Sequence, residues 1–88
     1  MNRQKLLDKA EVLKQYEPYS YQVAYALLRN ESLAVQAAKR VFIGLFEDDL
    51  FYHQLPSVQR LQVKQASMKQ ALLSYKHSAI NGVHQASS

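Results

Sequence analysis

Residues 31–46, ESLAVQAAKRVFIGLF, have the clearest helical periodicity in the chain. Their apolar residues recur at spacings of three and four and so form one stripe, as on an amphipathic helix. Small residues in the first half of the stripe would let a neighbouring helix approach closely, and Gly44 suggests the same, because glycine costs about 1 kcal/mol in a helix relative to alanine. Asn30 is a good cap for this helix and Glu31 suits its first turn. The stripe consists of Ala34, Ala37, Ala38, Val41, Phe42, Leu45 and Phe46.

The segment before this helix also favours helix, interrupted by Pro18. A first helix is expected from about Asn2 to Tyr16, with Leu6, Ala10 and Leu13 on its apolar face and its lysines elsewhere. Proline is tolerated in the first turn of a helix, so a second helix is expected from Pro18 to about Arg29. Tyr19 would then be presented on the turn beside Pro18, whereas the other tyrosines are expected at the edge of the core.

The segment after residue 46 predicts a short apolar connector, Leu50–Leu55, and then a long helix from Pro56 to about Ile80. Asn81-Gly82 is a left-handed cap signature and should end that helix. The sequence thus predicts the all-α class, with a small bundle of about four helices and a long C-terminal helix. Residues 1–82 would form one domain and residues 83–88 a frayed tail.

The expected C-terminal helix carries large apolar residues that alternate in spacing between three and four, with Gln65 in one polar position. This is the pattern of a coiled-coil seam. At about 25 residues the helix would be roughly 37 Å long, so the small body could not cover the whole seam. A second chain could cover it, and Met68, Leu72 and Tyr75 are the candidate self-association residues. The apolar seam positions are Val58, Leu61, Met68, Leu72, Tyr75 and Ala79.

The formal net charge of +4 arises entirely in the last part of the chain. Residues 1–49 hold all seven acidic residues and seven basic ones, whereas residues 50–88 hold four basic residues and no acid. This asymmetry suggests an anionic partner. Arg60, Lys64 and Lys69 are the candidate nucleic-acid contacts, and the alternative for them is a solvated helix face.

Catalytic and metal chemistry have no support in the sequence, so neither an enzyme nor a cofactor is expected. There is no cysteine, and His53, His77 and His84 are too dispersed for a metal site. The acidic run Glu47-Asp48-Asp49 is expected to do no more than face water. No apolar stretch is suited to a signal peptide or a membrane span, so a cytoplasmic protein without membrane contact is expected.

Residues 16–31, YEPYSYQVAYALLRNE, followed by the helix at 31–46, resemble the start of conserved region 2 of bacterial sigma-70-type sigma factors, especially the extracytoplasmic-function kind. The likeness covers about residues 6–55. It implies a transcription-associated binding module that engages RNA polymerase, a sigma factor, an anti-sigma factor or a second copy of itself, with DNA as a further candidate partner.

The chain departs from the family pattern where the family docks on RNA polymerase. The acidic docking motif is replaced by Gln36-Ala37-Ala38-Lys39-Arg40, and residues 56–75 contain no Trp or Phe to resemble the promoter-melting segment. By resemblance, Gln36, Lys39, Arg40 and Phe42 are the candidate partner contacts. Two alternatives stay open: a structural or adaptor bundle that self-associates through its C-terminal helix without a nucleic-acid role, and a nucleic-acid-binding module that uses the basic helix alone.

Overall fold

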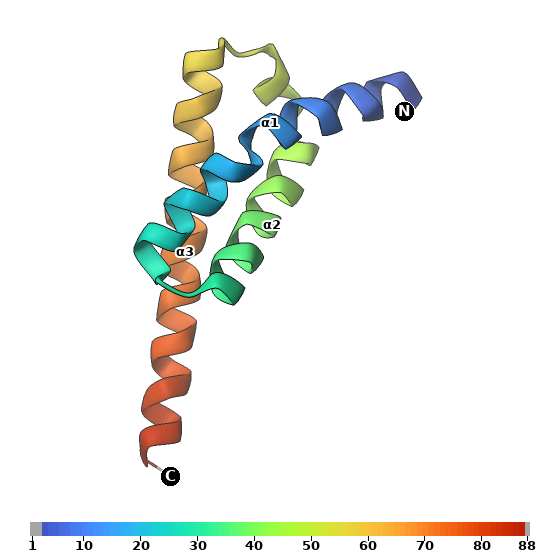
Figure 1. The fold of residues 1–88 in the computed structure, drawn as a ribbon. Helices are drawn as coiled ribbons and strands as arrows, with labels where there is room; N and C mark the ends of the chain where they lie inside the picture. Colours follow the sequence, from blue (N-terminus) through green and yellow to red (C-terminus); the bar gives the residue numbers. More distant parts are fainter. Residues whose placement is uncertain (1–2, 88) are drawn as a thin grey trace.

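The computed structural model describes the backbone of residues 3–87 and the side chains of Arg3 and residues 5–76. Its elements are α1 (Arg3–Leu28), α2 (Glu31–Glu47), the 3-10 helix η1 (Asp49–His53) and α3 (Pro56–Ser87). Figure 1 shows α1 and α2 packed side by side, with α3 lying across them. The all-α class is confirmed, but the bundle has three long helices rather than about four among these residues.

The expected break at Pro18 is wrong, because α1 runs through it without interruption. Pro18 cannot donate to the carbonyl four residues earlier, and such a loss bends a helix more readily than it ends one. Figure 1 shows α1 changing direction along its middle. The buried residues of α1 continue on one stripe across the proline, which explains why the helix persists. They are Lys9, Leu13, Ser20 and Ala24.

A two-residue connection, Arg29 and Asn30, joins α1 to α2. Arg29 has a left-handed backbone (φ 54°), and its N–H donates to the Tyr25 carbonyl at 2.8 Å. The Asn30 side chain accepts from the Leu33 N–H at 2.9 Å, so the predicted cap is confirmed. This reversal sets α2 against α1.

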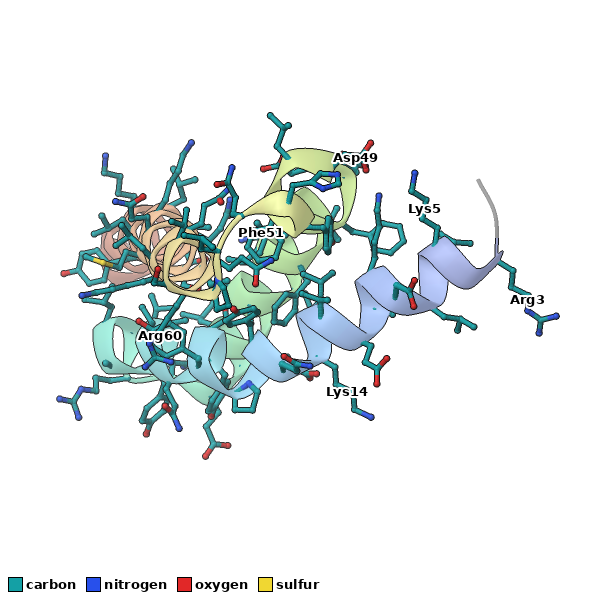
Figure 2. The ribbon with its side chains drawn as sticks, turned by 90° about the horizontal axis from the view of Figure 1, so that it is seen from above. Arg3, Lys5, Lys14, Asp49, Phe51 and Arg60 are labelled. Atoms are coloured by element: carbon teal, nitrogen blue, oxygen red, sulfur yellow. The ribbon has the colours of Figure 1, made fainter. Side chains whose placement is uncertain are left out.

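The main core cluster is built around Phe51, which η1 carries inward from the connector. The Phe51 side chain is 0% exposed and meets the rings of Tyr16 and Tyr52 edge-on, at centroid distances of 6.0 and 5.2 Å. Figure 2 shows Phe51 directed into the space between the helices. Gln59, itself buried, donates to the Phe51 carbonyl at 3.0 Å, so the connector is fixed to the start of α3. The other buried members of the cluster are Leu13, Val41, Leu45 and Val63.

A second cluster of small residues lies where the three helices approach closely. Ser20 of α1 and Ser67 of α3 are fully buried, and their hydroxyl oxygens are 2.6 Å apart, which satisfies both groups without water. Four alanines of the three helices are buried in this cluster as well. They are Ala24, Ala34, Ala37 and Ala71.

The α3 helix extends beyond the body, as the sequence predicted. Its 32 residues correspond to about 48 Å, close to the longest molecular dimension of 52 Å. The helix continues past Asn81 and Gly82 to Ser87, so the expected end at Ile80 is wrong. No glycine in the described residues has a positive φ, and the cap signature is therefore unused. The separate tail predicted for residues 83–88 stays a prediction.

Gly44 does not mark a close helix approach, contrary to the sequence-based interpretation. A Cβ built on this residue would have no atom within 4 Å. Replacing Gly44 with alanine should therefore stabilise the protein by up to about 1 kcal/mol, because alanine has the higher helix propensity and meets no clash. Urea denaturation followed by circular dichroism measures the change. An unchanged or lower midpoint would contradict the open space seen at this position.

Candidate protein-binding surfaces

The side of α2 that faces away from the core carries two of the residues that the sequence predicted as partner contacts. Gln36 and Lys39 are both exposed there. Two exposed apolar side chains, Val35 and Ile43, flank them along α2. The outer side of α2 is therefore a mixed surface of apolar and polar groups, with Lys39 contributing a positive charge.

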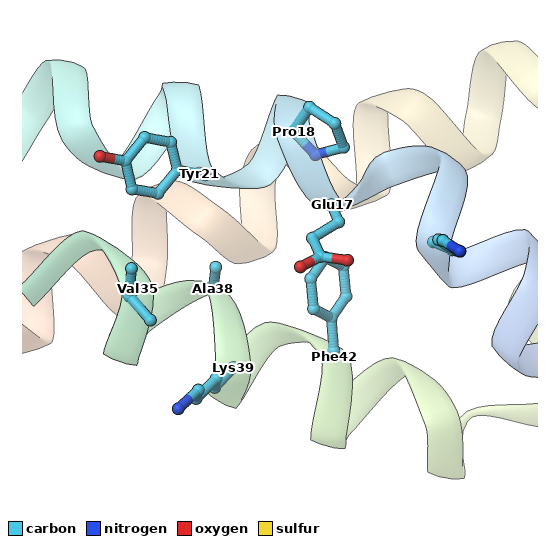
Figure 3. Close-up of a pocket in the computed structure, with 8 residues that line it drawn as sticks. Glu17, Pro18, Tyr21, Val35, Ala38, Lys39 and Phe42 are labelled. Carbon is cyan, nitrogen blue, oxygen red and sulfur yellow. The ribbon is translucent and has the colours of Figure 1, made fainter. Parts of the chain in front are cut away.

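An apolar groove of about 430 Å³ lies beside this surface, between α1 and α2 (Figure 3). Phe42 lines the groove and also packs against the main core cluster, so this predicted partner contact is half-buried rather than displayed. Pro18 of α1 is itself part of the lining. The groove is lined by Lys14, Glu17, Pro18, Tyr21, Val35, Ala38, Lys39 and Phe42.

Arg40, the fourth predicted partner contact, turns away from these residues. Its guanidinium donates from Nη1 to the Ser74 hydroxyl of α3 at 3.3 Å. The predicted set therefore divides: Gln36 and Lys39 face outward, Phe42 faces the α1 side and Arg40 faces α3.

The candidate nucleic-acid contacts are not gathered on one surface. The Arg60 guanidinium lies 4.0 Å from the centroid of the Tyr19 ring on α1, so Tyr19 is covered by a cation rather than displayed on a turn. Lys69 instead lines a groove between α2 and α3 together with Arg40 and Asp48. Lys64 and Lys69 are five residues apart, or roughly 140° around the helix. Binding of DNA or RNA by this set stays a prediction.

The self-association residues lie on the side of α3 that faces away from α1 and α2. Met68, Leu72 and Tyr75 are all exposed, and Leu72 retains 53% of its surface. Figure 2, which looks nearly along α3, shows that no other described element covers this side. The sequence predicted that the body would cover part of the seam, but α3 packs through different residues. Its inward positions are Gln59, Val63, Ser67, Ala71 and Ser74.

One buried residue was not predicted from the sequence: Lys9 of α1, whose ammonium lies at the C-terminal end of α2. Lys9 is only 6% exposed, and its ammonium donates to Asp49 and to the Phe46 carbonyl at 2.5 and 3.3 Å. The same ammonium lies 5.4 Å from the centroid of the Phe46 ring and 5.3 Å from that of Tyr52. It thus places a cation at the C-terminus of α2, where the helix dipole favours one.

Two residues of the acidic run at the end of α2, Asp48 and Asp49, contact neighbouring elements, contrary to the expectation that the run only faces water. Asp48 accepts from the Leu50 N–H and from the Gln62 side chain, both at 3.2 Å, and so ties η1 to α3. Asp49 is the partner of Lys9. The burial of Lys9 could have been inferred from its position four residues before Leu13, on the face that α1 buries.

The hydrogen bond and charge of Lys9 hold the pKa of Asp49 below its usual range. A depressed folded pKa contributes stability above the unfolded pKa of about 4, and the contribution is lost as the pH falls through the folded value. We therefore expect Asp49→Asn to be less stable than the wild type at pH 7, with the difference shrinking below about pH 4. Thermal unfolding across this pH range measures it. Glu47→Gln, at a neighbouring exposed acid, is the control. A difference that stays constant with pH would contradict the ion pair.

Neither a cluster of metal ligands nor a membrane-spanning helix occurs in the part of the chain that the structure describes. No group of three potential metal ligands occurs among these residues. None of the described helices combines the length and apolar character needed to cross a bilayer.

No protein-family model, curated protein or solved structure matches this chain.

Proposed function

We propose that this chain is a non-catalytic binding module of transcription that engages a protein partner through the α1–α2 side. The observation that carries the proposal is the apolar groove between the two helices, which is lined in part by exposed Lys39. The resemblance to sigma region 2 assigns the polymerase-docking element to the same part of α2. An apolar groove beside a few polar groups is a common form of binding site.

The charges on this side favour a sigma factor or an anti-sigma factor over the polymerase docking surface. In the sigma family, acidic residues of this helix meet a basic surface, whereas this chain has Lys39 on this side. Lys14 and Lys39 also line the groove, with Glu17 as its only acidic group. Like charges across an interface oppose binding, so an acidic partner surface fits better.

A pull-down with the tagged full chain, against RNA polymerase and the sigma and anti-sigma factors of the same organism, tests the proposal. We expect recovery of one of these proteins by the wild type and by Arg3→Glu, a charge reversal at the far end of α1 (Figure 2). Lys39→Glu should lose it. Recovery of none of these proteins, or equal recovery by both variants, would overturn the proposal.

A further inference from the structure

The outer seam of α3 is an apolar surface that no other described element covers. We define it as Val58, Leu61, Gln65, Met68, Leu72 and Tyr75. All six are exposed, and they alternate in spacing between three and four residues. From Val58 to Tyr75 the seam is roughly 25 Å long. An exposed stripe made mostly of large apolar residues commonly marks an interaction site on a small protein.

The seam is not required for the fold, because α3 packs against α1 and α2 through its opposite side. Val63, Ser67 and Ala71 provide that contact and are fully buried. The helix therefore has two apolar faces. The inner face carries small residues and the outer face carries large ones. The outward spacing is that of the a and d positions of a coiled coil, which fit a second helix.

The charges beside the seam indicate which charges the second helix carries. Lys64 lies along one edge, and Lys69 and Lys76 lie along the other; all three are exposed. The sequence has no acidic residue from position 50 onward, so α3 offers these lysines no partner of its own. We propose that the outer seam binds an amphipathic helix of another protein whose apolar stripe is flanked by Asp and Glu.

A second copy of this chain fits the seam less well. A parallel pair of α3 helices would set Lys64 of one copy beside Lys69 of the other, at both edges. An antiparallel pair would also meet lysines without any acid, because α3 has none. Like charges at these flanking positions oppose pairing and select a different partner.

An anionic membrane surface is also a poorer match than a helix. Gln65 interrupts the middle of the stripe, whereas membrane-surface helices have a broad apolar face. A shallow groove of about 410 Å³ adjoins the seam, lined by Met68, Leu72 and Leu73 with Lys69 and Lys76 at its sides. Such a groove suits one protruding side chain of a partner helix better than a lipid layer.

This proposal is independent of the α2 surface and is tested separately. Two synthetic amphipathic peptides of about four heptads serve as probes, one with glutamate and one with lysine beside a leucine seam. Fluorescence anisotropy measures the binding of each to the full-length chain. We expect the glutamate peptide to bind at least tenfold more tightly, with affinity falling as salt rises.

Matched variants assign the binding to the seam. Leu72→Glu should abolish it, whereas Leu7→Glu should retain it, because Leu7 is similarly exposed (57%) but lies on α1. The double variant Lys69→Glu, Lys76→Glu should reverse the peptide preference. Circular dichroism establishes that each variant is folded, which is expected because these residues lie outside the core.

Three outcomes would overturn the proposal. The first is the absence of any preference for the glutamate peptide. The second is a dimer of the chain alone, seen by sedimentation velocity and dissociated by Leu72→Glu, which would assign the seam to a second copy. The third is binding to phosphatidylcholine–phosphatidylglycerol vesicles that Leu72→Glu abolishes, which would assign it to a membrane surface.

Discussion

Replacing Phe51 with alanine is expected to lower the free energy of unfolding by about 3–5 kcal/mol, the usual cost of truncating a buried phenylalanine. The Phe51 ring is fully buried between the rings of Tyr16 and Tyr52. Its carbonyl is also held by Gln59, which accepts in turn from the Tyr16 hydroxyl at 3.0 Å. At ~0.05–0.15 kcal/mol per residue, a chain of this length has a total free energy of unfolding of about 4–13 kcal/mol. The substitution therefore removes a large part of the stability.

Urea unfolding followed by circular dichroism measures this effect. Leu50→Ala is the matched control, because Leu50 precedes Phe51 and is 70% exposed. The control should change the unfolding free energy by no more than about 0.5 kcal/mol. Equal midpoints for the two variants would contradict the placement of Phe51 in the core.

Ala71→Leu is expected to destabilise the protein by about 1–3 kcal/mol, through the opposite mechanism. Ala71 is fully buried among Ala24, Ala34 and Ala37, where all three helices contribute a small side chain. A leucine there must push the helices apart or adopt a strained rotamer.

The same substitution at an exposed alanine separates overpacking from a general effect of leucine. Ala26 is exposed on α1, and Ala26→Leu should leave the urea midpoint nearly unchanged. If Ala71→Leu were as stable as Ala26→Leu, the close approach of the helices at this cluster would be wrong.

The class of fold and the position of α2 could be predicted from the sequence, because the stripe at residues 31–46 and the Asn30 cap are local signals. The continuity of α1 could not, since Pro18 is a strong local breaker and only packing on both of its sides keeps the helix intact. The partner of Lys9 could not be predicted either, because η1 brings Asp49 from forty residues away.

The orientation of α3 is a case in which hydrophobicity alone misleads. Among its described residues, the largest apolar side chains face outward, and the inner face carries smaller ones, as at Ser67 and Ala71. Of the predicted site residues, the exposure of Gln36 and Lys39 follows from helical periodicity, whereas that of Met68, Leu72 and Tyr75 depends on which face of α3 packs inward. The engagement of Arg40 with Ser74 and of Arg60 with Tyr19 requires knowledge of how the helices cross.

The inner face of α3 contributes to both core clusters, with Val63 in the main cluster and Ala71 in the second. Each cluster also includes residues of α1 and α2, so neither can form from two helices alone. The consequence is cooperative folding: detaching α3 exposes both clusters at once, and no partly folded subset of helices retains a complete core. We therefore expect the protein to unfold in a single two-state transition.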